Sequence, residues 1–333
     1  MSEREGKRVL ITGVSRFLGL RLAKRLENAD GVAHVVGVDL EEPPVPVRGL
    51  EFIRADISSP LIARVIEATR VDTIVHNQIV RRPTAEQMSP RKAHDINVIG
   101  SLQLLAACEK TDSVRAIVIR GSAGIYGAEP GAPQFFTEDM ARLYPLRTRF
   151  QRDVAEIENL FATFARRHPD VVCTMLRYQP AIGPSLDTQI ARYLMLPVPP
   201  PYLGFDPRIQ LVHEDDALDA LVAAVRRPIH GAVNVAGSGT VGLTRMLRTA
   251  GRVSLPLIGP AFGPVVDGMR RAGLAELSPD FRRLLRYGRA VDTSRLSEEV
   301  GFAARFSTEA AVSDYVQRRN AADGAASRVA VNS

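Results

Sequence analysis

Two glycines follow the first apolar run of the chain and could hold a phosphate group. In the stretch VLITGVSRFLG, Gly13 and Gly19 take the outer positions of a G-x-x-G-x-x-G spacing, and Arg16 takes the middle one. Between a strand and a helix, such glycines permit a tight turn and let a diphosphate approach the backbone N–H groups at the helix start. The loop therefore indicates a nucleotide site, although two glycines alone are a weak motif.

Arg16 has two interpretations. It is either a solvent-exposed cation over the loop, or a contact whose guanidinium lies along the diphosphate and replaces a backbone N–H with a charged donor. We favour the second interpretation, in which Arg16 binds the ligand directly.

Two carboxylates follow the next apolar runs. Asp39 comes about twenty residues after Gly19, where an acidic side chain accepts hydrogen bonds from an adenosine ribose. Asp56, in the stretch RADI, is placed to reach the adenine amino group. A negative charge at Asp39 would repel a 2′-phosphate, so the residues favour NAD over NADP as the cofactor. Arg16 leaves NADP as the less favoured alternative, since a guanidinium could also bind that phosphate.

The elements that must position these residues alternate along the first half of the chain. Apolar runs predict strands at 8–13, 34–40, 50–57, 71–77, 115–122 and 171–178, and helical spacing predicts helices at 18–29, 59–69, 91–111 and 152–169. Strands that are apolar along their whole length are buried on both faces. The pattern predicts an α/β protein with a Rossmann-type doubly wound parallel sheet and a small C-terminal α/β substrate subdomain.

The change of pattern after the last of these strands suggests the domain organisation. We expect an NAD-binding Rossmann domain over 1–180, with sheet elements returning from the C-terminal half, a substrate-binding subdomain over 181–318, and a flexible tail over 319–333. A proline cluster at 196–204 breaks regular structure inside the second part.

Composition narrows the class of protein. The chain has 333 residues, 45% hydrophobic and 24% charged, as is typical of a soluble globular protein. Its net charge of +6 comes from arginines scattered along the chain, which argues against a nucleic-acid partner. No apolar run approaches the roughly 18 residues of a membrane helix, and the polar N-terminus has no signal core, so we expect a cytoplasmic protein without a membrane partner. Cys108 and Cys173 lie in apolar runs as expected for buried thiols.

Taken together, the motifs resemble a known family. TGVSRFLG, RADI, DTIVHNQ, NVIGSLQLLAAC, GSAGIYG, LRYQPAIGP and LVHEDDALDAL come in the order found in the extended short-chain dehydrogenase/reductases, within the NAD-dependent epimerase/dehydratase group that acts on nucleotide sugars. The resemblance runs from about Arg8 to Tyr315. It implies cofactor contacts at Gly13, Ser15, Arg16, Phe17, Leu18, Gly19, Asp39, Leu40, Asp56, Ile57, His76, Asn77, Gln78, Asn97, Tyr178 and Pro180.

The family's proton-transfer pair is missing from this sequence. Its chemistry uses a Tyr-x-x-x-Lys pair, in which the tyrosine exchanges a proton with the substrate oxygen and the lysine lowers the tyrosine pKa and holds the ribose. Anchored on Glu158, the two positions are Phe150 and Val154, and no tyrosine of the chain has a lysine four residues on. Ser122 matches the serine or threonine that binds the substrate oxygen.

Substitutes for the missing pair exist, and each also has a structural interpretation. Tyr126 could present a phenol, Arg152 with Asp153 could place charges near the nicotinamide, and His76 could act as an acid or base. Arg81 and Arg82 either face an anionic substrate or are solvated. His213, Asp215 and Asp216 look like metal ligands on paper, but they match a helix-start motif in which a carboxylate caps backbone N–H groups, so we expect no metal.

Two functions follow from the resemblance and its departures. The first is an NAD-binding epimerase/dehydratase-like enzyme with a non-standard active site, acting on a nucleotide sugar or a secondary-metabolite intermediate. The alternative is a cofactor-binding protein without redox turnover, serving as a scaffold, a regulator or a non-redox cyclase or dehydratase. Family members often pair through the helices that hold NVIGSLQLLAAC and RDVAEIENLFATF, so a homodimer is expected.

Overall fold

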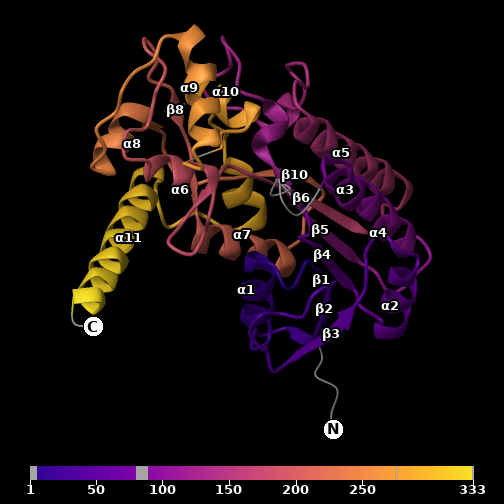
Figure 1. Ribbon diagram of the computed structural model, residues 1–333. Helices are drawn as coiled ribbons and strands as arrows, with labels where there is room; N and C mark the ends of the chain where they lie inside the picture. The colour runs from indigo at the N-terminus through magenta and orange to yellow at the C-terminus, as the bar shows by residue number, and fades with distance from the viewer. Residues whose placement is uncertain (1–5, 80–88, 275, 332–333) are drawn as a thin grey trace.

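The computed structural model describes residues 6–79, 89–274 and 276–331. Seven parallel strands form its central sheet, in the order β10-β6-β5-β4-β1-β2-β3 (Figure 1). Their bounds are β1 Lys7–Thr12, β2 Val32–Asp39, β3 Leu50–Arg54, β4 Thr73–His76, β5 Ala116–Ser122, β6 Val172–Tyr178 and β10 Gly231–Val235. The expected α/β class and doubly wound sheet are confirmed.

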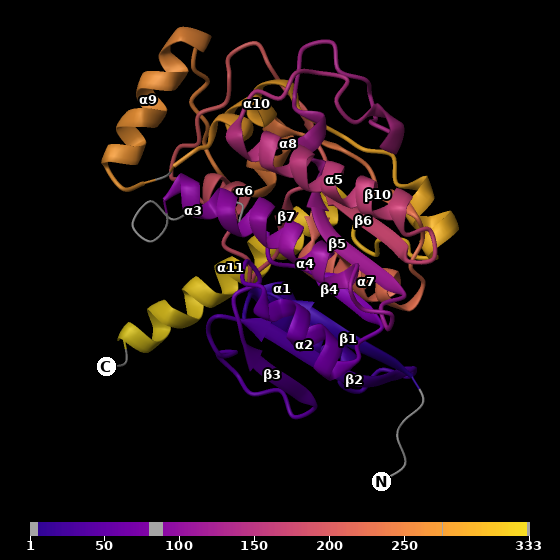
Figure 2. The ribbon, with the colours of Figure 1, turned by 90° about the vertical axis from the view of Figure 1, so that its right-hand side faces the viewer.

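Helices cover both faces of this sheet, which explains why its strands are apolar along their length. One face packs against α1 (Phe17–Leu26) and α7 (Glu214–Arg226). The other packs against α2 (Leu61–Thr69), α4 (Gly100–Cys108) and α5 (Arg149–Arg167), which lie in front of the strands in Figure 2. Val9, Leu10 and Ile11 of β1 are all fully buried, because consecutive side chains point to opposite covered faces.

A π-helical turn interrupts the long helix that the sequence predicts at 91–111. The helix begins as α3 (Pro90–His94), widens at η1 (Asp95–Ile99) and continues as α4. Single π-helical turns are frequent at functional sites, and this one carries the buried Asn97.

The C-terminal half builds a second lobe around its own core. Two short pairs of strands, β7 (Ala181–Ile182) with β9 (Val212–His213) and β8 (Arg208–Ile209) with β11 (Val241–Gly242), join the lobe to the sheet region. Its helices are α6 Gln189–Leu194, α8 Leu243–Thr249, α9 Gly259–Arg271, α10 Pro279–Tyr287 and α11 Thr308–Val331.

Two details refine the expected organisation. Strand β10 lies beyond residue 180 in the chain yet completes the sheet beside β6. The segment expected as a tail is helical as far as Val331, because its alanines extend α11. None of the helices in the described ranges has the length and apolarity needed to cross a membrane.

Candidate active site

The loop between β1 and α1 requires both of its glycines. Gly13 has φ +67°, which side chains other than glycine rarely adopt. A Cβ on Gly19 would lie 2.2 Å from the carbonyl oxygen of Gly13, so the start of α1 packs directly on the loop. The cradle is therefore open only while these positions lack side chains, which fits a loop that holds a diphosphate.

The residues between the two glycines divide into exposed and buried ones. Arg16 is the exposed N-cap of α1 and has no ion-pair partner among the described residues, which is compatible with both of its interpretations. Phe17 is half-buried and Leu18 is buried against the sheet core. Ser15 ties the loop to the end of β2, since its Oγ donates a hydrogen bond to the Glu41 carbonyl.

Asp39 is buried at the end of β2, where the sequence places it. Its two carboxylate oxygens accept the backbone N–H groups of Ser15 at 3.2 Å and of the exposed Leu40 at 2.8 Å. The charge is thus held next to the phosphate loop by the loop itself. Asp56 instead closes a local turn, because its Oδ1 accepts both the N–H and the hydroxyl of Ser58. Ile57 is buried beside it.

The structure corrects the acid–base interpretation of His76. The side chain is fully buried, with Nδ1 2.8 Å from Thr12 Oγ1 and Nε2 2.9 Å from Ser101 Oγ. Burial, together with the nearby Arg120, lowers the pKa of His76 to about 4. Both ring nitrogens are engaged between the sheet and α4, so the side chain has a structural role.

Polar side chains follow His76 at the carboxyl edge of the sheet, beside the loop between β1 and α1. Asn77 Nδ2 donates to the Gly13 carbonyl at 3.4 Å, and its Oδ1 accepts from Arg120 at 3.2 Å. Gln78 is 5% exposed, contacts Gly13, and its buried Oε1 has no hydrogen-bond partner among the residues that the structure describes. A buried unsatisfied polar atom is costly, and at this place it suits a ligand with a hydrogen-bond donor.

A small pocket of about 50 Å³ lies at the carboxyl ends of β5 and β6. Ser122, Phe150 and Tyr178 all line it, together with Leu18 and Arg120. Phe150, which we predict to take the family's tyrosine position, therefore lines the same pocket as Ser122 with an unreactive phenyl ring. Val154, predicted to take the lysine position, is buried one turn further along α5.

Three other predicted cofactor contacts are buried, and one of them, Tyr178, lines this pocket. The hydroxyl of Tyr178 donates to the Ala217 carbonyl at 3.0 Å, and burial raises its pKa well above the ordinary value. Asn97 is buried in the π-helical turn, and Pro180 follows β6 with its carbonyl accepting the N–H of Val212.

The predicted catalytic candidates Tyr126 and Arg152 do not line this pocket. Tyr126 is 1% exposed; its hydroxyl donates to Asn234 Oδ1 at 2.7 Å and accepts from Arg177 at 2.8 Å. Burial raises the pKa of Tyr126 to about 12. Arg152 is exposed on the first turn of α5, while the neighbouring Asp153 is buried and pairs with His94 at 2.8 Å.

Arg120 is the pocket residue that sequence reasoning missed. The sequence did carry a signal, since a charged residue two positions before Ser122 interrupts the apolar run RAIVIRGS. Arg81 and Arg82, the other basic pair considered, lie outside the described residues.

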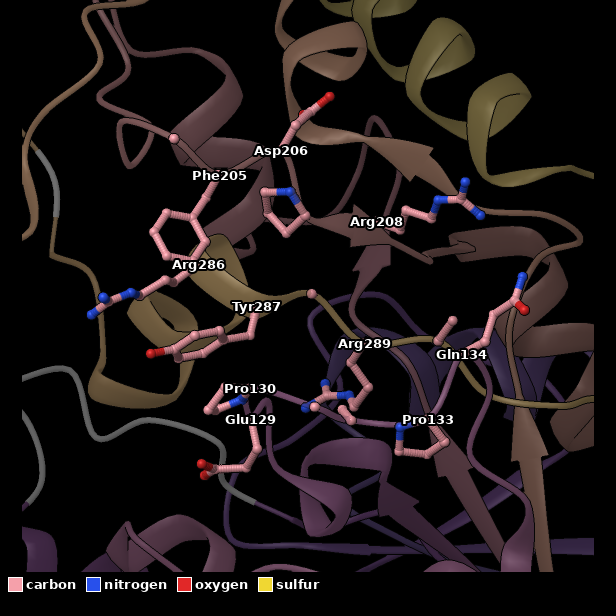
Figure 3. Close-up of a pocket in the computed structure, with 16 residues that line it drawn as sticks. Glu129, Pro130, Pro133, Gln134, Phe205, Asp206, Arg208, Arg286, Tyr287 and Arg289 are labelled. Atoms are coloured by element: carbon pink, nitrogen blue, oxygen red, sulfur yellow. The ribbon is translucent and has the colours of Figure 1, made fainter.

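A larger hollow of about 400 Å³ opens between the two lobes' loops (Figure 3). Segments 129–134, 204–208 and 286–290 line it. Arg286 lies 5.0 Å from the ring of Phe205 and has a buried Nε without a hydrogen-bond partner. Arg208 extends on the opposite side. Both side chains suit a ligand that carries negative charge.

Among the three residues that resemble metal ligands in the sequence, His213 and Asp216 accept hydrogen bonds from backbone N–H groups. Asp216 is fully buried and accepts the N–H groups of Arg305 and Phe306, which fastens α7 to the C-terminal lobe. His213 caps α7 by accepting the N–H of Asp215. In the described part of the chain, no group of three acidic, histidine or cysteine side chains is arranged to hold a metal ion.

This geometry defines a Rossmann-type α/β protein with a pocket at the carboxyl edge of its parallel sheet. The chain belongs to the NAD dependent epimerase/dehydratase family, whose model matches residues 9–236. The resemblance drawn from the motifs is thereby confirmed.

Relatives and solved structures resemble this chain over different shares of its length. An uncharacterized protein of Mycobacterium tuberculosis is 38% identical over 324 residues, covering 94% of this chain and 84% of that protein. The UDP-glucose 4-epimerase of Neisseria meningitidis is 24% identical over 186 residues, 53% of this chain and 54% of that protein. The structure of Thermotoga maritima UDP-glucose 4-epimerase with UDP-glucose superimposes with a TM-score of 0.73 at 19% identity, covering 95% and 99% of the two chains. MoeE5 with UDP-glucuronic acid and NAD gives 0.69 at 22% identity, covering 94% and 99%.

Proposed function

We propose that this protein binds NAD at the carboxyl edge of its sheet and acts on a small molecule with an active site that differs from the family's usual one. The observation that carries the proposal is the pocket of Ser122, which combines a hydroxyl, a cation and the phenyl ring of Phe150 where the family has a phenol. A nucleotide sugar or a secondary-metabolite intermediate is the substrate class that family membership supports.

The cleft residues suit the dinucleotide in distinct ways. Gly13 and Gly19 leave room for the diphosphate, and the orphaned oxygen of Gln78 offers an acceptor beside it. The buried carboxylate of Asp39 suits a ribose with free hydroxyls and disfavours the 2′-phosphate of NADP. NAD, when bound there, supplies a hydride acceptor. Ser122 would hold the substrate oxygen, and Phe150 would exclude water from that side of the pocket.

The larger hollow is our candidate for the body of the substrate. Arg208 and Arg286 line it, and aromatic rings surround Arg286. The carboxylates of Glu129 and Asp206 also line it, but Glu129 is paired with Arg147 and Arg283. This lining favours an anionic ligand with a planar group, such as the nucleotide part of a nucleotide sugar. The neighbouring structures that contain UDP-glucose or UDP-glucuronic acid support the same class.

A second candidate function has its own supporting observation. The phenols nearest the pocket, Tyr126 and Tyr178, are both held in other hydrogen bonds, and Phe150 cannot exchange a proton. A protein that binds NAD without redox turnover, as a scaffold, regulator or non-redox cyclase or dehydratase, would need none of them.

One experiment separates these functions. Purified protein would be titrated with NAD and NADP by calorimetry. Turnover of UDP-glucose and UDP-glucuronic acid would be followed by chromatography of the products, because an epimerase or dehydratase regenerates NAD, and by the absorbance of reduced nicotinamide for any net oxidation. The same assays would be run on the double variant Phe150→Tyr with Val154→Lys, using the two single variants as matched controls. Thermal unfolding would check that a lysine at the buried position 154 is tolerated.

The expected result is NAD binding that is tighter than NADP binding, with turnover by the double variant exceeding that of either single variant. Turnover by the wild type would favour the enzyme with an altered site. Tight NAD binding without turnover over a broad panel would favour the second candidate. Absence of dinucleotide binding to the wild type would overturn the proposal.

A homodimer is part of the same proposal. Ile99, at the end of η1, and Leu102, in the first turn of α4, are 38% and 42% exposed although both are apolar. A groove between α4 and α5, lined in part by Leu105 and Leu160, continues this face. Pairing of these helices with those of a second copy would cover it, and sedimentation of a Leu102→Glu variant as a monomer would support that arrangement.

A further inference from the structure

Arg120 carries a cation into the fold, and within the described ranges it has no acidic partner. It lies on β5 between apolar residues, is half-buried, and lines the pocket of Ser122. Its side chain donates a hydrogen bond from a terminal guanidinium nitrogen to Asn77 Oδ1 at 3.2 Å. No carboxylate in the described ranges lies within ion-pair distance of it. Charged groups inside proteins are ordinarily paired, so this guanidinium is poised for a ligand.

The strand registers place Arg120 in line with the phosphate loop. Thr12 pairs with His76, and His76 pairs with Ile119, so the next residues of β1, β4 and β5 form a row. That row is Gly13, Asn77 and Arg120. Neighbouring strands are about 4.8 Å apart, so the backbone of Arg120 lies about 10 Å from the loop glycine.

Hydrogen bonds connect this row. Arg120 donates to Asn77, and Asn77 donates to the carbonyl oxygen of Gly13. Two residues further along β5, Ser122 lies on the same face of the strand, because side chains alternate. Arg120 therefore lies between the loop suited to a diphosphate and the hydroxyl suited to the substrate.

Gln78 provides a second, independent observation at the same floor. It is 5% exposed, its backbone contacts Gly13, and its Oε1 has no hydrogen-bond partner in the described part of the chain. A buried acceptor without a donor, next to a cation without an anion, fits a ligand that carries both hydroxyl groups and negatively charged oxygens.

Resting on the proposed function, we propose that Arg120 is the cationic residue of the cofactor cleft, taking from β5 the part that the family's lysine plays from the helix. Its guanidinium binds the oxygens of the dinucleotide between the diphosphate and the second ribose, and Gln78 accepts a hydrogen bond from the same region. Asn77 positions the guanidinium. The pocket thus keeps a positive charge near Ser122 although Val154 is apolar.

The test uses three probes, NAD, ADP-ribose and AMP, which all contain adenosine and its 5′-phosphate. NAD and ADP-ribose contain the diphosphate and second ribose, whereas AMP contains neither and would contact only the Asp39 end of the cleft. Calorimetry would compare wild type, Arg120→Met and Arg120→Lys. The matched control is Arg115→Met, which removes the same charge at the exposed amino-terminal side of the same strand.

A charge-assisted hydrogen bond of this kind corresponds to about 10- to 100-fold in affinity. Arg120→Met should weaken NAD and ADP-ribose by that factor, leave AMP unchanged, and reduce the salt dependence of NAD binding. Arg120→Lys should recover part of the loss, and Arg115→Met should match wild type. If the methionine variant does not fold, Arg120→Gln, which retains a donor for Asn77, carries the same expectation.

Equal NAD affinity in wild type and Arg120→Met would overturn the role of Arg120 while leaving the proposed function intact. An equal loss for AMP and NAD would also overturn it, because that result indicates a general disturbance of the cleft. A wild type that binds none of the three probes would overturn the proposed function together with this inference.

Discussion

Replacing Tyr126 with phenylalanine removes one hydroxyl that joins the turn after β5 to two strands of the sheet. The hydroxyl donates to Asn234 on β10 at 2.7 Å and accepts from Arg177 on β6 at 2.8 Å, and the side chain is 1% exposed. Water cannot replace the lost group. Arg177 retains two hydrogen bonds to Glu158 and one to the Glu138 carbonyl, so part of the network survives.

The magnitude follows from the two lost bonds. A hydrogen bond with a charged partner contributes about 1.5–3 kcal/mol and a neutral one about 0.5–1.5 kcal/mol. Because Arg177 keeps its other partners, we expect the free energy of unfolding to fall by about 2 kcal/mol, near the low end of the sum. Dinucleotide binding should not change, since the hydroxyl lies outside the pocket.

Urea unfolding followed by circular dichroism would measure the loss, and calorimetry with NAD would measure binding. Tyr144→Phe is the matched control, because its hydroxyl makes an exposed bond to the Gly131 carbonyl, and its loss should cost little. A Tyr126→Phe protein with wild-type stability but impaired ligand binding or turnover would refute the structural role and restore Tyr126 as a candidate for chemistry.

Three further predictions concern the cleft and its support. Gly19→Ala should abolish NAD binding in calorimetry, because its Cβ would lie 2.2 Å from the Gly13 carbonyl oxygen; binding within twofold of wild type would contradict this packing. Asp39→Asn should raise the ratio of NADP to NAD affinity by about tenfold, since it removes one repulsive charge; an unchanged ratio would argue against a ribose at this end. Burial lowers the pKa of His76 to about 4, below its ordinary 6.5, so stability is full above pH 6.5 and falls as the pH drops toward 4. The free energy of unfolding, measured by urea titration, should be about 2 kcal/mol lower at about pH 5 than at about pH 7.5. His76→Asn should reduce that difference.

The sequence was most informative where local pattern decides structure. The strands of the sheet, the loop glycines and Asp39 could all be placed from periodicity and spacing, because a buried parallel strand and a phosphate loop each have a local signature. The failures were side chains whose role depends on distant partners. Tyr126 bonds to a residue 108 positions away and His76 to residues 64 and 25 positions away.

Arg120 is a residue that the sequence marks as unusual without identifying its partners. An arginine inside an apolar run marks an unusual position, but the sequence does not say whether an acidic residue elsewhere pairs with it. Only the strand registers reveal that Asn77 and the loop glycine are its neighbours in the row.

Because β10 comes late in the sequence, it limits where the protein can be truncated and when its sheet can form during synthesis. A protein ending at residue 180 would contain the whole phosphate loop, yet the outer edge of β6 would be bare and Tyr126 would lose Asn234. Exposed strand edges promote aggregation. On the ribosome, the sheet can close only after Val235 has emerged, so much of the second lobe must already be outside the exit tunnel when the nucleotide-binding half reaches its final form.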